Sequence, residues 1–480
     1  MYLDREKTGR KSNVTPFLTS LRNQITADRL ALRCRAALLW LALAALLLFL
    51  YLYVARSQSD INDDLQANDQ GAYMGFAIQA YQTNFNYTGG RNRMPLYPFI
   101  QALFYSPDLD KQAFFEQGKT LNVALSILCL TVLSVAFFSK FSKLYALYAI
   151  LVIGFLVFAI KAPYFQTEIL FYTLFGLAFI FSVEALSSPR WYKSLALGLC
   201  FALAHLSKAS ALPGLAIYML SCLVLILSRL ATRGISGIDL MPCFQQSLLP
   251  LLTFVALLFP YIQESKERYG AYLYNVNTTF YVWYDSWEEA KAGTRSAGDR
   301  RAWPDLPDNE IPSLSKYLDE HSNEQIIDRF RNGLQRMIAF GCYLHRSKHR
   351  FGYCSQVGLN LIVLALSLAL IAIRSQLHRL GRRLHVLCFI ILFHLFYALA
   401  YAWYMPIIGN GPRTILSLMI PLLWTVGLAL HAEALSSCRF GIRNWRFSAS
   451  TVVYSAILLS LIYEIYQVID YRAFTMYGGE

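Results

Sequence analysis

The stretch AALLWLALAALLLFLYLYVA, from Ala36 to Ala55, decides the fold class of this protein. It carries no charged residue, and it has the length of about 20 residues that an α-helix needs to cross the hydrocarbon core of a bilayer. Its apolar residues are continuous and do not alternate with polar ones, which argues against a strand of a membrane barrel. The stretch therefore predicts a membrane-spanning helix.

The composition of the whole chain extends this prediction. Of the 480 residues, 56% are hydrophobic and only 15% are charged, whereas globular domains have about 45–50% and about 25%. This excess excludes a soluble enzyme, a disordered chain and a disulfide-rich secreted module. We expect an all-α polytopic membrane protein with about 11 transmembrane helices. The further apolar runs lie at 121–138, 142–160, 166–186, 193–207, 210–228, 247–263, 356–373, 384–404, 413–434 and 450–469.

The net charge of +13 indicates how the chain is oriented. Basic residues are concentrated in the N-terminal arm and in every second loop, and the positive-inside rule assigns that side to the cytoplasm. We therefore expect an integral protein of the plasma (bacterial inner) membrane, with the N-terminus inside and the C-terminus outside. The charge needs no nucleic acid to explain it. The basic loops carry Lys140, Lys143, Arg190, Lys193, Arg229, Arg233, Arg374, Arg379, Arg382, Arg383, Arg439, Arg443 and Arg446.

This topology gives one membrane domain with two outward insertions. Helical spacing within the first insertion predicts two short surface helices, in GAYMGFAIQAYQ (71–82) and PLYPFIQALFY (95–105). In the second insertion, YVWYDSW (281–287) is interpreted first as interfacial aromatics and second as a sugar-stacking surface. The expected parts are a cytoplasmic basic arm at 1–35, a transmembrane module at 36–263 with its first outer loop at 56–120, an extracytoplasmic cap at 264–355, a second transmembrane module at 356–469 and an extracytoplasmic tail at 470–480.

The nine cysteines show no spacing typical of a metal site. Cys342 and Cys354 share the second insertion, so they can form a disulfide in an oxidising compartment or stay as two free thiols. Both alternatives stay open at the level of the sequence.

Ionisable residues at the ends of membrane spans are candidates for function. A mixture of carboxylates and cations at one membrane face suits a reaction in which the cations hold a lipid phosphate and a carboxylate takes a proton from an acceptor. Simpler roles are also open: a helix cap for Asp69, snorkelling for Lys208, and a topology charge for Arg413. The candidates on the outer side are Asp69, Arg91, Arg93, Glu168, His205, Lys208 and Arg413.

Several of these residues lie in segments that resemble a known family. The segments are NDQGAYMGFAIQAY (68–81), RNRMPLYPFIQALFY (91–105), Thr167-Glu168, HLSKASALPGLAIY (205–218) and GPRTILSLMIPLLW (411–424). In this order, they resemble the motifs of the lipid-dependent glycosyltransferases of the GT-C superfamily. Within it, they are similar to the branch that holds protein O-mannosyltransferases and the aminoarabinose transferase of lipid A. Gln70 departs from the Asp-Glu pair that is common there.

The resemblance implies a sugar donor on a polyprenyl phosphate or diphosphate and an acceptor that is a glycan, a lipid or a protein. Asp69 would deprotonate the acceptor, which attacks the anomeric carbon with inversion, and Glu168 would position the acceptor or assist the base. Lys208 and Arg413 would bind the leaving phosphate, supported by Arg91, Arg93 and His205. Membrane lipids are the other expected partners. The sequence contains no metal-ligand motif and implies no certain cofactor, although Asp69 and Glu168 can share a divalent cation.

Two other classes of function compete with this interpretation. A transporter or flippase of a lipid-linked sugar or other amphiphile would have charges deep within its spans and helices broken by Gly or Pro in two matching halves. The predicted spans are uninterrupted, and the charges gather at one face, which favours the transferase. A non-catalytic subunit of a glycan assembly machine would keep the fold without the chemistry, so only an activity assay separates it from an enzyme.

Overall fold

The computed structural model describes residues 14–66, 69–86, 92–233, 239–296, 311–342, 352–373, 384–408, 415–431, 439–442 and 445–470. Only the backbone is described at 14–33, 232–233, 338–342, 352–355, 370–373, 408, 439–442, 445–450 and 467–470. The chain forms two units, Met1–Tyr53 and Val54–Glu480. The first unit contains most of helix α1 (Val14–Ile61), so the helix already begins within the predicted basic arm. The second unit contains the last turns of α1 and all other elements.

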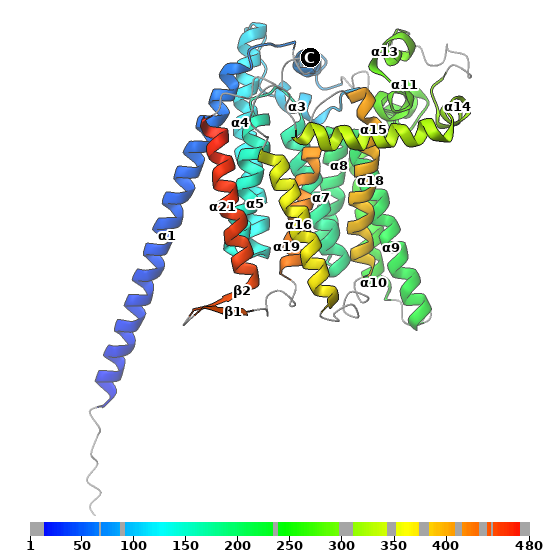
Figure 1. Ribbon diagram of the computed structural model, residues 1–480. Coiled ribbons are helices and arrows are strands. Elements are labelled where there is room, and N and C mark those ends of the chain that lie inside the picture. The colour runs from blue at the N-terminus through cyan, green and yellow to red at the C-terminus, as the bar shows by residue number, and fades with distance from the viewer. Residues whose placement is uncertain are drawn as a thin grey trace, which may run out of the picture. The chain divides into compact units, whose positions relative to one another are not determined.

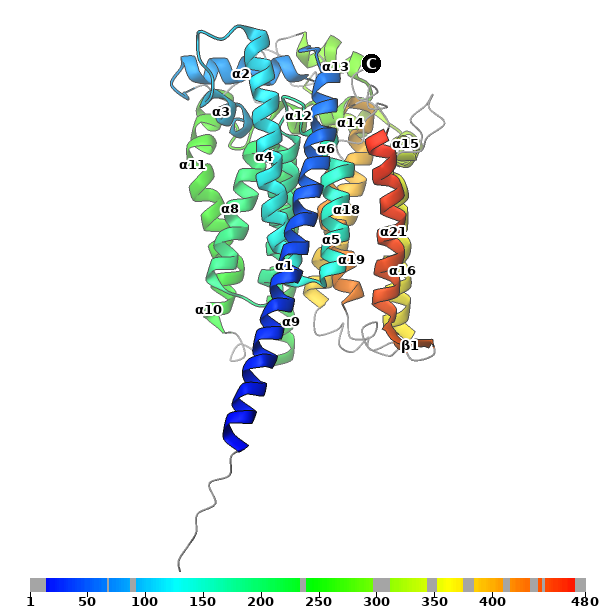
Figure 2. The same ribbon diagram turned by 90° about the vertical axis from the view of Figure 1, so that its left-hand side faces the viewer.

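The second unit is built around a bundle of apolar helices (Figures 1 and 2). Within the described residues, each apolar run predicted from the sequence coincides largely with one or more helices, which confirms an all-α polytopic membrane fold. The bundle helices are α4 (Lys111–Lys140), α5 (Lys143–Leu151) with η2 (Val152–Phe158) and α6 (Ala159–Lys161), α7 (Glu168–Ser187), α8 (Trp191–Ser207), η3 (Ala209–Ala211) with α9 (Leu212–Arg233), α10 (Leu240–Cys243) with η5 (Phe244–Leu248) and α11 (Leu249–Tyr269), α16 (Gly352–Ile373), α18 (Leu384–Ile408), η9 (Ile415–Leu418) with α19 (Met419–Leu430), and α21 (Ala449–Asp470).

Not all of these helices are equally long. Within the described residues, seven helical segments are long and apolar enough to cross a membrane, the first of them in α1. The apolar stretches described in α16, α19 and α21 are shorter, at 10–17 residues each. Helix α8 has 17 residues and corresponds to the shortest predicted span.

The flanks of the bundle carry apolar side chains that face outward. On α4, Leu128, Val132 and Val135 recur at helical spacing and are 60%, 42% and 68% exposed. Leu220, Leu223 and Leu227 of α9 form a similar exposed row. In contrast, α7 is apolar on all sides and almost entirely buried, and it contacts α4, α8, α18 and α19. A helix that is hydrophobic all round belongs in a core, whereas exposed apolar rows belong against lipid.

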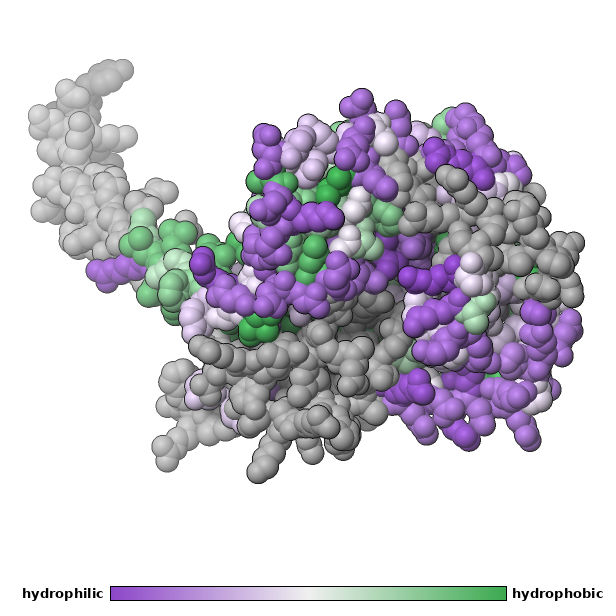
Figure 3. Space-filling model, turned by 90° about the horizontal axis from the view of Figure 1, so that it is seen from above, coloured by the Kyte–Doolittle hydropathy of each residue, from purple (hydrophilic) through white to green (hydrophobic). Residues whose placement is uncertain are grey.

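The two ends of the bundle differ. One end carries the elements of both insertions, and we call it the insertion end (Figures 1 and 2). Seen from this end, the described surface is mainly hydrophilic, with smaller hydrophobic patches (Figure 3). The opposite end carries α10 and an antiparallel hairpin that the sequence does not predict, β1 (Arg439–Ile442) and β2 (Trp445–Ser448). The elements of the insertion end are α2 (Gln70–Gln82), α3 (Leu96–Ala102), α12 (Val276–Thr279), η6 (Tyr281–Trp283), α13 (Trp287–Ala290), η7 (Lys291–Arg295), α14 (Leu314–Glu320) and α15 (Asn323–Cys342).

Helices α2 and α3 confirm the two surface helices predicted in the first insertion. Their aromatic residues pack on the loop 162–167, which connects α6 to α7. The ring of Tyr97 lies edge-on to Tyr73 at 5.6 Å and to Phe165 at 5.8 Å, and Phe165 meets Phe114 at 5.5 Å between ring centroids. Edge-to-face pairs at these distances are favourable. This aromatic cluster therefore fixes the first insertion against the loop and the start of α4.

Candidate functional site

Asp69 lies directly before α2, at the position of a helix cap. Its side chain makes no capping hydrogen bond to α2, so the structure does not use it as a cap. Its backbone has φ +70° and ψ 4°, in the left-handed region that non-glycine residues rarely adopt. A non-glycine residue in this region costs of order 1–3 kcal/mol and is found at sites where the surrounding structure holds it. The backbone therefore orients the Asp69 carboxylate at a cost to stability.

The Asp69 carboxylate is paired with Arg93. An Arg93 Nη2 to Asp69 Oδ1 distance of 2.5 Å joins them, with the Asp69 side chain 37% exposed and that of Arg93 19% exposed. The guanidinium also lies over the ring of Tyr73, with its Cζ 5.6 Å from the ring centroid. Arg93, in the motif segment 91–105, therefore contacts two residues of the other motif segment of the first insertion, 68–81.

The segment around Arg93 is held by α11 and by the second insertion. The Tyr261 hydroxyl and the Asn275 amide both donate to Met94 Sδ, at 3.5 and 3.4 Å. The Asn277 amide donates to the carbonyl of Asn92 over 3.0 Å. Because residues on both sides of Arg93 are bonded in this way, the position of the Asp69–Arg93 pair depends on both insertions.

Glu168 and Lys208 form the second pair of opposite charges at the insertion end. Lys208 Nζ lies 2.8 Å from Glu168 Oε1, and the Glu168 side chain is only 2% exposed. Glu168 is the first residue of α7, where a carboxylate interacts favourably with the helix dipole. Lys208 directly follows α8, and its Nζ also lies 5.5 Å from the centroid of the Phe171 ring. The structure thus brings together two residues that are 40 positions apart and that the sequence assigned to one membrane face.

The loop that precedes Glu168 is buried, and side-chain amides satisfy its backbone. The Asn122 amide donates to the carbonyls of Ala162 and Tyr164, at 2.9 and 2.7 Å. Buried backbone groups are costly unless they are paired, so these amides are what allows a loop to run through the interior. Asn122 lies on α4. Asn62, directly after α1, also donates to the carbonyl of Pro163, and Gln70, at the start of α2, accepts from the N–H of Phe165.

Gln70 connects the two charged pairs. Its Oε1 accepts a hydrogen bond from the backbone N–H of Phe165 over 2.9 Å, three residues before Glu168, and Gln70 itself follows Asp69 directly. The residue is fully buried. The GT-C branch that the sequence resembles commonly has a second acidic residue at this position. This chain has an amide there, which bonds the residue after Asp69 to the loop before Glu168.

His205 is buried between aromatic rings one turn before Lys208. Its ring centroid lies 6.1 Å from that of Phe254 and 5.9 Å from that of Tyr261, which also contacts Met94. His205 therefore belongs to the packing that joins α8, α11 and the Arg93 segment. Its predicted role in supporting the phosphate stays a prediction.

The structure adds three residues that the sequence did not single out. Lys161 is 3% exposed at the end of α6, with Nζ 5.0 Å from the centroid of the Tyr164 ring. Lys119 is also buried, but its ammonium donates to the carbonyls of Ser59 and Asn62, which is a structural role. Burial, with a smaller effect of the Glu168 carboxylate, raises the pKa of Tyr97 well above its ordinary value. Tyr97 therefore stays neutral beside the site. Lys161 follows the predicted span 142–160 at its outer end, where the positive-inside rule disfavours basic residues, and this position is the signal that could have found it.

Some of the predicted residues cannot be placed. Arg91 and Arg413 lie outside the described residues, as do the side chains of Cys342 and Cys354. Among the residues that are described, no group of three or more His, Cys, Asp or Glu side chains is arranged to hold a metal ion.

No family model and no curated protein matches the sequence. Among solved structures, the fold is similar to the archaeal oligosaccharyltransferase AglB from Archaeoglobus fulgidus, solved in complex with an inhibitory peptide and a dolichol-phosphate. The TM-score is 0.50 at 13% sequence identity, and the match covers 90% of this chain and 56% of the archaeal chain. This chain therefore spans just over half of that protein's length. At this identity the likeness concerns the fold alone, and it supports the GT-C-like fold that the sequence motifs imply.

Proposed function

We propose that this protein is a glycosyltransferase that moves a sugar from a polyprenyl-phosphate or -diphosphate donor to an acceptor at the extracytoplasmic face of the membrane, with inversion. The observation that carries the proposal is the joined arrangement of two carboxylate–cation pairs, Asp69–Arg93 and Glu168–Lys208, at one end of a GT-C-like bundle. The motif resemblance favours the branch of the protein O-mannosyltransferases and the aminoarabinose transferase.

Asp69 is the proposed general base. Its carboxylate is more exposed than that of Glu168, so an acceptor hydroxyl or amine can reach it. General-base catalysis typically contributes a factor of about 10²–10⁴ to the rate. In the transition state the acceptor proton passes to Asp69, the bond from the acceptor to the anomeric carbon forms, and the bond to the phosphate oxygen breaks. Glu168 positions the acceptor or assists the base.

Cations in the same region suit the leaving phosphate. Negative charge grows on the phosphate as the glycosidic bond breaks, and fixed cations stabilise this charge more in the transition state than in the ground state. Lys208 is the described residue proposed for this role. Arg413 and Arg91 are proposed from their motifs, with Arg93 and His205 in support. A divalent cation shared by Asp69 and Glu168 is a separate hypothesis.

The proposed cellular setting follows from the charge distribution. Basic loops at 139–143 and 188–193 lie at the end opposite to the insertions, so the positive-inside rule orients the insertion end away from the cytoplasm. A bacterial chain would lie in the inner membrane, with its site facing the periplasm and its product in the cell envelope.

The test is donor binding and turnover by the full-length protein in nanodiscs. A panel of polyprenyl-linked sugars is offered with a membrane extract as acceptor, to the wild type, Asp69→Asn and Asp63→Asn. Asparagine tolerates the left-handed backbone and keeps the side-chain size, and Asp63 is a matched exposed aspartate of the same loop. We expect Asp69→Asn to bind the donor but to lose transfer by at least about 100-fold, while Asp63→Asn behaves as the wild type.

Other outcomes redirect the proposal. Equal turnover by Asp69→Asn and the wild type would remove Asp69 as the base. A wild type that binds the donor without transferring its sugar would favour a transporter, and one that binds no donor would favour a non-catalytic subunit. Transfer that stops in excess chelator and returns with added divalent cation would support the shared-cation hypothesis.

A further inference from the structure

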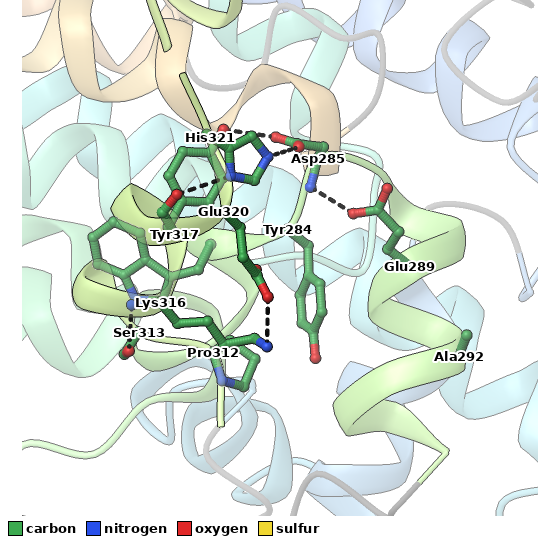
Figure 4. A pocket seen from close by; sticks show the side chains of 11 residues that line it. Tyr284, Asp285, Glu289, Ala292, Pro312, Ser313, Lys316, Tyr317, Glu320 and His321 are labelled. Atoms are coloured by element: carbon green, nitrogen blue, oxygen red, sulfur yellow. Dashed lines mark hydrogen bonds and ion pairs between the residues drawn. The ribbon is translucent and has the colours of Figure 1, made fainter. Parts of the chain in front are cut away.

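A separate pocket lies in the second insertion, between α13 with η7 on one side and α14 on the other (Figure 4). Its volume is about 300 Å³, at the lower end of the range for small-molecule sites. The lining combines aromatic rings with carboxylates, including Trp283, Tyr284, Asp285, Glu289 and His321. None of the predicted catalytic residues is part of it.

The framework of this pocket is fixed by Arg329 of α15. Its Nη1 lies 2.6 Å from Asp285 Oδ1, and its other nitrogens donate to backbone carbonyls of Val282, Tyr284 and Trp403. The guanidinium also lies 4.2 Å from the centroid of the Trp403 ring, on α18. The wall that carries Trp283, Tyr284 and Asp285 is therefore preformed and attached to the bundle.

Most of the charges around the pocket are already paired. Asp285 contacts both Arg329 and His321 Nε2, the latter at 2.7 Å, and Lys316 pairs with Glu320 at 2.7 Å. Three carboxylates, from Asp285, Glu289 and Glu320, thus face two permanent cations. A strongly charged ligand would have to compete with these pairs. A neutral ligand with many hydroxyl groups can instead add hydrogen bonds to the remaining lone pairs of the carboxylates.

The aromatic residues specify the rest of the ligand. Trp283 and Tyr284 line the pocket and are half-buried, so part of each aromatic side chain is accessible to a ligand. The face of an aromatic ring is negative, and it attracts the slightly positive C–H groups of a sugar ring, whose hydroxyl groups lie around its edge. An apolar platform with acceptors at its rim is therefore complementary to a pyranose.

We infer that this pocket binds one saccharide unit of the acceptor, as a subsite apart from the catalytic pairs. The inference deepens the proposed function and rests on it, since it names the acceptor as a glycan. A structural connection supports the assignment: the Asn277 amide donates to Asn92 beside Arg93, and Asn277 Oδ1 accepts from Tyr404 of α18. Asn277 lies only six residues before Trp283, so the pocket and the Asp69–Arg93 pair share one support.

The test measures binding of free sugars without any donor. Saturation-transfer NMR on the full-length protein in nanodiscs uses methyl glycosides of the common hexoses and N-acetylhexosamines as probes. The variants are Glu289→Gln and Lys316→Gln in the lining, and Glu288→Gln as the matched control, because Glu288 is the exposed neighbour of Glu289 on α13 outside the pocket. We expect at least one glycoside to bind the wild type, Glu288→Gln and Asp69→Asn alike. Glu289→Gln should weaken its binding about tenfold, because it removes a hydrogen bond to a charged group. Lys316→Gln, which releases the Glu320 carboxylate of the lining, should weaken it too at an unchanged melting temperature.

Binding of a glycoside that Glu289→Gln and Lys316→Gln leave unchanged would overturn the inference, and so would the absence of binding across the panel. Donor binding that is lost in Glu289→Gln together with glycoside binding would assign the pocket to the donor sugar and overturn the acceptor role. Because these measurements need no turnover, they separate the two proposals. Glycoside binding with no donor turnover would refute the transferase and with it the acceptor role, and would leave a saccharide-binding pocket. Turnover without glycoside binding would refute only the subsite.

Discussion

The side chains of Asn62 and Gln70 are paired by two hydrogen bonds, in which each amide nitrogen donates to the oxygen of the other residue, at 2.9 and 2.8 Å. Both residues are buried. Asn62 also donates to the carbonyl of Pro163, and Gln70 accepts from the N–H of Phe165. The pair thus holds the start of α2, and with it Asp69, against the loop that leads to Glu168.

Replacing Gln70 with glutamate creates the Asp-Glu pair that is common in the GT-C branch that the sequence resembles. This change should lower the free energy of unfolding. A carboxylate cannot donate to Asn62 Oδ1 or to the carbonyl of Asp64, which Gln70 Nε2 now contacts. An unsatisfied buried acceptor costs about 1–3 kcal/mol of unfolding free energy. Denaturation in detergent measures this loss, with Gln79→Glu on the exposed face of α2 as the control. Equal stability of the two variants would show that the amide pair is not needed.

The left-handed backbone of Asp69 can be separated from the chemistry of its carboxylate. Asp69→Gly and Asp69→Ala both lose the pairing with Arg93, so their difference reports the backbone alone. Glycine adopts φ +70° freely, whereas alanine pays about 1–2 kcal/mol there. We expect Asp69→Gly to be more stable than Asp69→Ala by about 1 kcal/mol in chemical denaturation, with neither variant active in transfer. A more stable alanine variant would contradict the left-handed conformation.

The Glu168–Lys208 pair should show strong coupling in a double-mutant cycle. Lys208→Met leaves the buried Glu168 carboxylate without its main cation, and breaking a buried pair costs about 3–5 kcal/mol. Glu168→Gln combined with Lys208→Met should be less damaging than the sum of the single changes. The pair Glu264–Arg268 of α11, with side chains 26% and 55% exposed, serves as the reference, because i,i+4 helix pairs at the surface couple by about 0.5 kcal/mol or less. Additive effects at Glu168 and Lys208 would argue against a direct interaction.

Two glycines provide a matched test of the packing around the loop 162–167. A Cβ added at Gly118 of α4 would overlap the ring of Phe165, which is enclosed by the aromatic cluster. Gly118→Ala should therefore destabilise the protein by about 1–3 kcal/mol. At Gly75 of α2 no atom lies within 4 Å of an added Cβ, so Gly75→Ala should gain about 0.5–1 kcal/mol. Melting temperatures measured in the same detergent check both signs.

The sequence predicts the helices well, because each membrane span is specified locally by a continuous apolar run. The topology also assigns Glu168 and Lys208 to one face, and the structure pairs them. The pairing itself could not be predicted, since the order of charges along the chain does not reveal which helices are neighbours.

Other features of the site depend on single long-range contacts that leave no periodic signal. The bonds from Asn62 to Pro163 and from Gln70 to Phe165 span 101 and 95 positions. An amide in a loop looks the same in sequence whether it is solvated or supports a buried backbone. The positive φ of Asp69 is equally hidden, because aspartate occurs in many kinds of turn and cap.

The π-helix η2 places a constraint of a different kind on the site. Its hydrogen bonds close wider turns than those of an α-helix, and all of its seven residues are buried. Each residue of a regular helix turns the next one by about 100° around the helix axis. A π-helical turn holds about one residue more than an α-helical turn, so the loss of one residue within 152–158 can be absorbed by a return to an ordinary helix. The loss of one residue from the regular helix α5 would instead turn Lys161 and the start of the supported loop by about 100° toward a different neighbour. The orientation of the insertion end therefore depends on the length of α5, and η2 is the part of this span where the loss of one residue should be tolerated best.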